Sequence, residues 1–415
     1  FAMSKFSIYD KYYFESVLST LFAWGVVLKI CLLLGMSKYD YIIAGAGASG
    51  LLLADALGSD SFFASKSILL IDKDLKQQND RTWCFWEEGT GQFDSIAHKI
   101  WPNIHFAGKT LRLDTDIAPY RYKLVRGLDF YDHYRKKLGA FSNVTWITKN
   151  IESIQETAKG VVVETTQGSY EASKVFSSLF NYDSILNQNK YPVLQQHFVG
   201  WFVRLDQAVL DDQTARFMDF SVPQKGNTRF MYLLPFSKTE ALFEYTLFSK
   251  EPLERSEYED AIKEYLQEHF PNVNYEITET EQGNIPMSCF PFEKWNTNKV
   301  VGIGIAGGWA KPSTGFTFYN SSRKVKELVK YLKAGKPLSK FHRNDKFRFY
   351  DMLLLDVLAR DNSLGQSIFE SLFRKRKVPL ILKFLDNRTS FLEDVLMMSA
   401  PNPFPFIRAL FGRIF

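Results

Sequence analysis

Cysteine, histidine and net charge are all scarce in this sequence, and each scarcity excludes something. Its three cysteines, Cys31, Cys84 and Cys289, form no Cys-x-x-Cys pair, which excludes a disulfide framework and favours reduced thiols in a cytoplasmic setting. The six histidines show no metal-ligand spacing, so we expect no bound metal. A net charge of +5 on 415 residues does not indicate a nucleic-acid partner.

Two further absences narrow the class of protein. No Gly-x-Ser-x-Gly motif occurs, so nothing indicates a serine hydrolase. Repeats and low-complexity linkers are also lacking, and the length fits two or three globular domains. Aromatic residues are abundant instead, with 37 Phe and 20 Tyr. This abundance fits either a Phe-rich core or a long apolar pocket with a lipid-facing surface.

The N-terminal segment is ambiguous. Residues 17–35 are apolar enough to be weighed as a membrane span, although Lys29 interrupts them. Met36 then precedes a strand of the kind with which many dinucleotide-binding proteins begin. We therefore expect residues 1–35 to be an extension outside the functional fold, and a true anchor or signal segment is the alternative.

The most informative stretch is IIAGAGASGLLLADAL, residues 42–57. Gly45, Gly47 and Gly50 have Gly-x-Gly-x-x-Gly spacing between a predicted strand, residues 39–44, and a predicted helix, residues 48–57. A second apolar strand, residues 67–71, ends at Asp72. This combination predicts a Rossmann-type dinucleotide site, in which the helix N-terminus binds the pyrophosphate and the acid binds the ribose.

The rest of the chain predicts a β-rich middle and a helical end. Residues 160–178 alternate like a hairpin, and aromatic strands follow at 197–205, 215–222, 229–237 and 240–249. A helix is expected at 255–270, and helices dominate after Phe316, at 320–334, 341–360, 364–385 and 389–399. We predict an α/β fold: a Rossmann-type dinucleotide-binding portion (36–150), an inserted antiparallel β-rich portion (151–290), a return to the dinucleotide-binding domain (291–335) and a helical C-terminal region (336–415).

Several motifs together resemble the FAD-dependent lycopene cyclases of the plant and bacterial type. Besides the glycine fingerprint, these motifs are NDRTWCFWEEG (79–89), FMDF (217–220), LFEYTLFS (242–249) with EQGNIPM (281–287), and GIAGGWAKPSTGFTF (304–318). The chain departs from the family pattern in two places. The second acid of the usual Glu-Glu pair is Tyr245, and Phe316 stands where Tyr is usual. The Gly-Asp of many flavin hydroxylases is also missing, since Gly304 is followed by Ile305.

The resemblance implies a lycopene β-cyclase that turns acyclic ψ end groups into β-ionone rings. It also implies that the dinucleotide is FAD and that the inserted portion binds the substrate. Reduced FAD would be the cofactor, with NAD(P)H as the electron source, and the reaction would have no net redox change. It needs an acid, and Glu244 on an apolar strand is the candidate, with Asp219 and Glu281 as weaker ones. The expected cofactor-binding residues are Gly45, Ala46, Gly47, Ser49, Gly50, Asp72, Arg81, Gly307 and Gly308, and the expected substrate-pocket residues are Trp83, Phe85, Trp86, Phe243, Tyr245 and Phe316.

An apolar carotenoid substrate implies a membrane partner. Basic and aromatic residues mix at 367–385, around Arg374–Lys377, and again at 404–415, which favours peripheral association with a membrane surface. Other enzymes of carotenoid synthesis are further possible partners. Two alternatives stay open: a flavin-dependent monooxygenase or reductase acting on an apolar isoprenoid, and a flavin-binding protein without catalysis.

Overall fold

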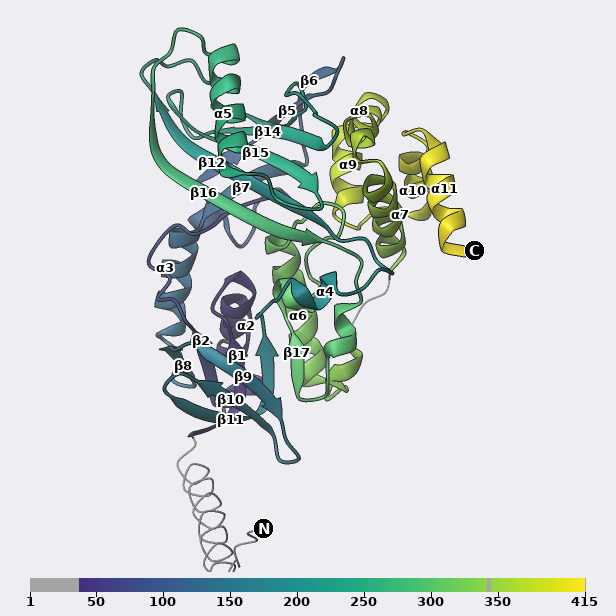
Figure 1. The fold of residues 1–415 in the computed structure, drawn as a ribbon. Coiled ribbons are helices and arrows are strands. Elements are labelled where there is room, and N and C mark those ends of the chain that lie inside the picture. Colours follow the sequence, from purple (N-terminus) through teal and green to yellow (C-terminus); the bar gives the residue numbers. More distant parts are fainter. Residues whose placement is uncertain (1–36, 342–344, 415) are drawn as a thin grey trace, which may run out of the picture.

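The structure, a computed structural model, describes residues 37–341 and 345–414. Residues 1–35, where a membrane span was weighed, lie outside the described residues. Within the described part, two large sheets lie one above the other, with helices beside them and a C-terminal group of helices along one side (Figure 1). The mixed α/β architecture with C-terminal helices confirms the predicted fold class.

The first sheet contains the predicted βαβ unit. Strand β1 (Ser37–Ala44) leads into helix α2 (Ala48–Gly58), and β2 (Ile68–Asp72) returns parallel to β1. The sheet order is β8-β2-β1-β11-β10-β9, and β17 pairs with β11. The apolar runs of β1 and β2 are fully buried because both faces of the sheet are covered. The remaining strands are β8 (Val144–Thr148), β9 (Ile151–Glu156), β10 (Val161–Thr165), β11 (Gly168–Ser177) and β17 (Val300–Gly302).

The second sheet contains the predicted aromatic strands, in the order β16-β12-β15-β14-β13-β5-β6. Helix α5 (Arg255–His269) covers one face through a cluster that includes Phe243 and Tyr265. The opposite face turns toward the first sheet (Figure 1). The strands are β5 (Asn103–Ala107), β6 (Arg112–Asp116), β12 (Leu194–Leu205), β13 (Thr214–Asp219), β14 (Thr228–Pro235), β15 (Glu240–Ser249) and β16 (Tyr275–Met287).

The sequence pattern predicted a boundary at residue 150, but the strands of the two sheets are not separated there. The hairpin β10–β11 lies beyond that boundary, yet β11 pairs in parallel with β1 in the first sheet. Conversely, β5 precedes the boundary but pairs with β13 in the second sheet. Alternating polarity identifies a hairpin but not the sheet that its outer edge joins, so the sequence pattern could not show this exchange.

A small third sheet and a helix connect the two large sheets. Strands β3 (Thr82–Glu88), β7 (Tyr120–Arg126) and β4 (Lys99–Trp101) are ordered β3-β7-β4, and helix α3 (Gly127–Leu138) follows β7 directly. The motif NDRTWCFWEEG therefore ends in β3, which carries side chains to the space between the large sheets.

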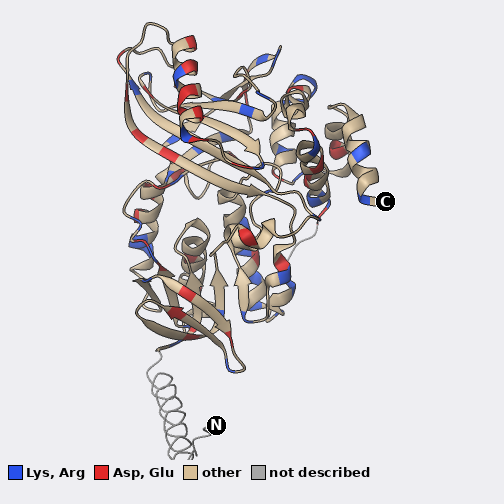
Figure 2. Cartoon of the chain, viewed as in Figure 1, with Lys and Arg blue, Asp and Glu red and all other residues tan. Residues whose placement is uncertain are grey.

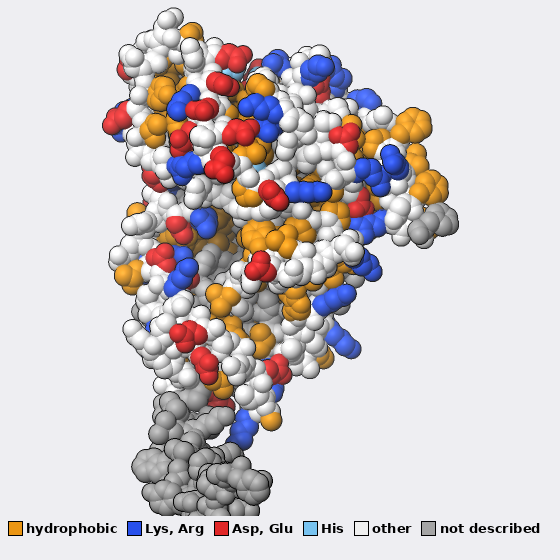
Figure 3. Space-filling view, viewed as in Figure 1, with side chains coloured by type: hydrophobic (Ala, Val, Ile, Leu, Met, Phe, Trp, Pro, Cys, Tyr) orange, Lys and Arg blue, Asp and Glu red, His pale blue; other side chains and the backbone are white. Residues whose placement is uncertain are grey.

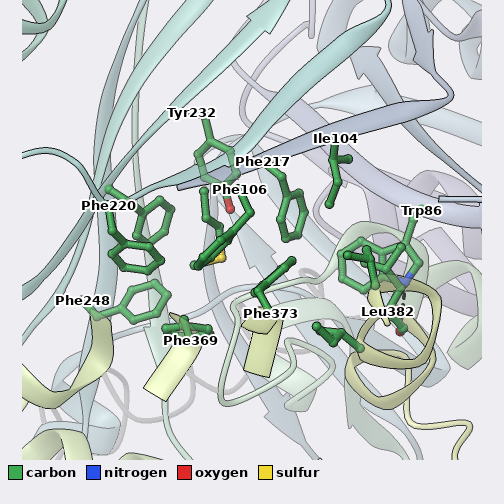
Figure 4. Packing of buried hydrophobic residues seen from close by; sticks show 14 of the residues in the cluster. Trp86, Ile104, Phe106, Phe217, Phe220, Tyr232, Phe248, Phe369, Phe373 and Leu382 are labelled. Carbon is green, nitrogen blue, oxygen red and sulfur yellow. Dashed lines mark hydrogen bonds between the residues drawn. The ribbon is translucent and has the colours of Figure 1, made fainter. Parts of the chain in front are cut away.

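The C-terminal helices pack against part of the face of the second sheet that is opposite α5. A buried aromatic cluster joins them to it: Phe373 stacks on Phe106 with ring centroids 3.9 Å apart, and the Trp86 indole N–H donates to the Leu382 carbonyl (Figure 4). The expected helix at 364–385 is two helices, because Pro379 cannot continue the first one. The C-terminal helices are α7 (Lys346–Arg360), α8 (Gly365–Lys375), α9 (Val378–Leu385), α10 (Phe391–Met398) and α11 (Pro403–Ile414). Two further helices, α4 (Asp183–Leu186) and α6 (Phe318–Lys333), precede them in the chain.

Candidate active site

A cavity of about 400 Å³ lies between the two large sheets, and both contribute to its lining. Gly47 and Ser49, at the N-terminus of α2, line one end. Leu242 and Glu244 of β15 line the other. The fingerprint and the candidate acid, almost two hundred residues apart in sequence, therefore face a single space.

Glycine has a different structural consequence at each of the three fingerprint positions. Gly45 has φ +102°, a conformation that L side chains rarely adopt. A Cβ at Gly50 would lie 1.9 Å from the Gly45 carbonyl oxygen, so glycine lets the helix pack on the strand. A Cβ at Gly47 would meet no protein atom within 4 Å, and Gly47 lines the cavity. Only at Gly47 does the absent side chain leave room for a ligand.

The surroundings of Gly47 fit the phosphate and ribose groups of a dinucleotide. The first turn of α2 opens into the cavity and contains no acidic residue, so its free N–H groups offer a positive end to an anion. Asp72 ends β2 beside this turn and accepts the Ala46 N–H. Ser49 is hydrogen-bonded to Ser321 of α6 at 2.8 Å, which fixes the helix start against the far wall.

Two cations that flank the fingerprint complete this end of the cavity. Arg81, a predicted cofactor residue, lines the cavity, and so does Lys76, which the sequence motifs had not indicated. The Lys76 Nζ lies 3.9 Å from Asp72 and 3.6 Å from Asp80. Asp80 in turn accepts the Tyr131 hydroxyl at 2.6 Å. The end of the cavity beside the start of α2 is therefore lined by charged side chains, of which Lys76 is held in place by ion pairs.

At the other end, Glu244 is paired with a second carboxylic acid. Gly200 on β12 is in register with Glu244 of β15 on one side and with Glu281 of β16 on the other. A Cβ at Gly200 would lie 3.2 Å from the Glu281 Cγ and 3.5 Å from the Glu244 Cβ. The absent side chain at position 200 thus lets two acids from flanking strands lie on one face of the sheet.

Burial and mutual charge keep this pair from ionising together. The pKa of Glu244 is raised well above its usual range, chiefly by burial and then by the charge of Glu281. Burial also raises the pKa of Glu281, although the Thr82 hydroxyl and the charge of Arg126 oppose that shift. Two negative charges on adjacent buried carboxyls repel each other, so the pair retains a proton under conditions that ionise exposed carboxyls.

Aromatic and sulfur-containing side chains form the wall around the acid. Tyr232 is directly opposite Glu244 across the β14–β15 pair, and Tyr122 and Cys84 lie close enough to Glu244 to feel its charge. Trp83 lines the cavity and stacks on Phe318, with ring centroids 4.9 Å apart. Tyr122, Tyr232 and Cys84 were missed by the motif analysis. The strand register opposite Glu244 is the signal that would have found Tyr232.

Comparison with known protein families identifies the chain at this point. The family model described as lycopene cyclase protein matches residues 40–411, nearly the whole chain. The chain belongs to the lycopene cyclase family. The resemblance that the motifs suggested is therefore confirmed. No curated protein matches the chain.

Solved structures similar to this family member are flavoproteins at low sequence identity. A geranylgeranyl bacteriochlorophyll reductase-like protein from Thermoplasma acidophilum is 11% identical, with 91% of this chain and 96% of that chain covered and a TM-score of 0.55. A flavin-dependent brominase is 15% identical, with 91% and 99% covered and a TM-score of 0.55. The p-nitrophenol 4-monooxygenase of Pseudomonas putida DLL-E4 is 14% identical, with 91% and 98% covered and a TM-score of 0.54. These likenesses support the predicted Rossmann-type flavoprotein fold.

Several residues predicted for the site of this cyclase family member lie elsewhere. Phe243 and Tyr245 alternate with Glu244 along β15, so their side chains point to the opposite face and pack under α5. Asp219 is also buried near α5, where it accepts the Tyr265 hydroxyl at 2.7 Å. Hydrogen bonds to Ser221 and Tyr265 lower the Asp219 pKa against the effect of burial. Asp219 is therefore an ionised acid outside the cavity.

The remaining predicted residues divide between the cavity and its surroundings. Phe316 lines the cavity and packs edge-on against Trp86, with centroids 4.6 Å apart. Trp86 and Phe85 lie behind that wall, around a small adjoining space of about 20 Å³. Gly307 and Gly308 line a neighbouring cavity instead, and Gly304 and Ile305 take their place beside Ser49. The cofactor-binding role of Gly307 and Gly308 stays a prediction.

Proposed function

We propose that this member of the lycopene cyclase family is a lycopene β-cyclase that uses bound FAD in its reduced form. The observation that carries the proposal is the shared cavity: a carboxylic acid whose pKa is raised by desolvation and by a neighbouring carboxyl faces the same space as the dinucleotide fingerprint. NAD(P)H is the proposed source of electrons for the flavin. The finer assignment, a β rather than another ring, rests on the resemblance in the motifs.

Glu244 starts the reaction as a general acid. Its O–H bond breaks and a C–H bond forms at the terminal double bond of a ψ end group, which leaves a tertiary carbocation. The next double bond attacks that cation and closes a six-membered ring, and loss of a ring proton to a carboxylate forms the β-ionone double bond. One proton enters and one leaves, so no electrons are transferred and the product is an isomer of the substrate.

The lining residues suit a reaction that passes through a cation. The faces of Trp83, Tyr122 and Tyr232 carry negative potential, which stabilises positive charge in a site with little water. Reduced flavin, when bound, would supply further negative potential from the fingerprint side. The apolar wall, with Leu234 and Leu242 beside Phe316, excludes the water that would otherwise trap the cation as an alcohol.

Expression in cells that accumulate lycopene, followed by pigment chromatography, tests this function. We expect γ-carotene or β-carotene to appear. A reductase or monooxygenase would consume NADPH in proportion to product and would give a reduced or oxygenated pigment instead. Protein that binds FAD but leaves lycopene unchanged would overturn the proposed activity.

A membrane surface is the proposed source of the apolar substrate, and the C-terminal helices α10 and α11 are the proposed contact. Within residues 37–341 and 345–414, none of the helices has the length and apolar character needed to cross a bilayer. Half of the large hydrophobic side chains exposed in the described part lie on α10 and α11, and Figure 3 shows hydrophobic side chains gathered at the end that carries the C-terminus. They are Phe391, Leu392, Val395, Leu396, Met398, Phe404, Ile407, Phe411 and Ile414.

Charge favours an anionic lipid surface at this face. The acidic residues of α10 are neutralised internally, Glu393 by Lys383 and Asp394 by Lys346. Residues 399–414 contain no acid and carry the exposed Arg408, and Figure 2 shows Lys and Arg on α11 and on the neighbouring C-terminal helices, whereas α10 itself contains neither. Arg413 is paired with Asp356, so Arg408 is the cation that this face offers to lipid headgroups. Exposed apolar side chains beside a surface cation and without free acids are the pattern of an interfacial helix.

The basic segment 374–377, which the sequence indicated, supports this contact less well than α10 and α11 do. The Arg376 guanidinium donates to the Leu396 carbonyl and to Ser399, and Lys375 donates to the Ala400 carbonyl. Arg374 is paired with Glu370. Lys375 and Arg376 thus link the end of α8 to residues 396–400, and Arg374 is paired within α8, so these charges are partly neutralised inside the molecule.

We expect the double variant Leu392→Ser, Phe404→Ser to fold normally and to bind anionic vesicles more weakly. The two side chains are 79% and 75% exposed, so folding buries little of them. Burying one Leu or Phe contributes about 1.5–3 kcal/mol, which predicts a loss of at least about tenfold in vesicle affinity. Sedimentation with phosphatidylserine-containing vesicles measures it. Phe62→Ser, at another exposed aromatic, is the control, and equal binding by all three proteins would remove α10 and α11 from the proposed contact.

A further inference from the structure

Glu281 is buried beside the candidate acid but does not line the cavity. Its carboxyl therefore has no direct access to a substrate there. One oxygen, Oε2, accepts the Thr82 hydroxyl at 2.6 Å. The other, Oε1, is buried without a hydrogen bond among the described residues. A carboxyl that is half satisfied, out of reach of substrate and next to a second acid needs an explanation, because burying such a group is unfavourable.

We propose that Glu281 is an ionised positioning residue that holds the catalytic proton on Glu244. The inference rests on the proposed function and assigns the two acids different states, one neutral and one charged. After Glu244 gives its proton to the alkene, the ring proton returns to the pair and the starting state is restored. No co-reactant is needed, because the same number of protons leaves and returns.

The surroundings of the two carboxyls differ in the direction that this assignment requires. Glu281 accepts a hydroxyl from Thr82 on β3, and the positive charges of Arg126 on β7 and Arg81 favour its ionised form against the nearby Glu279. Among the described residues no cation shifts the pKa of Glu244: the Thr246 hydroxyl donates to its carboxyl at 2.8 Å, and a side-chain hydrogen bond with Glu281 favours its neutral form. The other titratable groups that sense its charge are Cys84, Tyr122 and Tyr232, on β3, β7 and β14.

The arrangement depends on Gly200. Any side chain at that position would meet Glu281 Cγ on one side and Leu242 Cδ1, at 2.9 Å, on the other. Because β12 has no side chain at position 200, the charge of Glu281 on β16 can act on Glu244 of β15 across the intervening strand. A negative charge held beside Glu244 raises the pKa of that carboxyl, so the neutral acid persists to higher pH.

Infrared titration of the purified protein tests the inference without substrate. A protonated carboxyl has its own carbonyl stretch, and we expect one such band near neutral pH that Glu244→Gln removes. In Glu281→Gln the band should remain, but its titration midpoint should fall by about one pH unit, because the neighbouring negative charge is gone. The alkaline limb of the cyclisation rate should move to lower pH by the same amount. Glu276→Gln, at an exposed acid of the same strand, should change neither.

Thr82→Val provides a second variant with a smaller change of shape. It removes the hydroxyl that favours ionised Glu281, so the lower of the two midpoints of the pair should rise. An unchanged midpoint in Glu281→Gln, or a band that survives in Glu244→Gln and vanishes in Glu281→Gln, would overturn the inference. If the variants shift the titration midpoints as expected but the wild-type protein leaves lycopene unchanged, the proposed function is overturned and the assignment of the carboxyl pair stands.

Discussion

Gly47→Val should purify as a folded protein that contains no flavin. The backbone at Gly47 has φ −73° and ψ −175°, an extended conformation open to any residue, and a Cβ there meets no protein atom within 4 Å. Valine therefore fits the protein, but it fills the space at the start of α2 that the pyrophosphate of FAD must approach. The ratio of flavin absorbance to protein measures the effect, with circular dichroism as the check on folding.

The choice of glycine decides whether this experiment is informative. Valine at Gly50 would clash with the Gly45 carbonyl, and valine at Gly45 would strain a left-handed backbone, so either variant would lose flavin by losing structure. Gly412→Val is the matched control, because position 412 lies on the exposed surface of α11 and should retain one FAD per chain. A folded Gly47→Val protein with a full complement of FAD would show that the fingerprint does not bind the cofactor.

Local sequence patterns predicted the helices and strands of this fold better than they predicted which strands pair with each other. The βαβ unit was foreseen because its signals, an apolar strand, glycines at fixed spacing and a terminal acid, all lie within residues 39–72. Membership of β5 and β11 in their sheets was not foreseen, because strand pairing depends on contacts between residues far apart in sequence. A pattern with period two specifies a face of a strand but not its neighbour.

The candidate site shows the same division at the level of side chains. Glu244 was singled out from its apolar strand, and the cavity does contain it. Its partner Glu281 was only a weaker alternative, since nothing in the sequence shows that Gly200 aligns the two acids. Phe243 and Tyr245 were misplaced although alternation along β15 already put them on the other face from Glu244. Strict use of that alternation would have removed both from the predicted pocket.

Replacing Glu244 by glutamine should abolish most cyclisation while leaving the protein folded and loaded with FAD. Glutamine keeps the volume and accepts the Thr246 hydroxyl, but it has no proton to give an alkene. We expect the rate to fall by roughly 10²-fold or more, the usual contribution of general acid catalysis. Glu244→Asp should recover part of the rate to the extent that the shorter side chain still reaches the substrate. Conversion of lycopene by purified protein in vesicles measures both variants.

Glu240→Gln is the matched control, because Glu240 begins the same strand but is half-buried, lies outside the cavity and is paired with Arg204 at 2.9 Å. It should cyclise lycopene at the wild-type rate and bind FAD normally. If Glu244→Gln also kept the wild-type rate, the acid would have to be another group at the cavity or directly behind its wall. Asp219 would not qualify, because it is ionised on the far face of the sheet, and Glu281 would be the next carboxyl to replace.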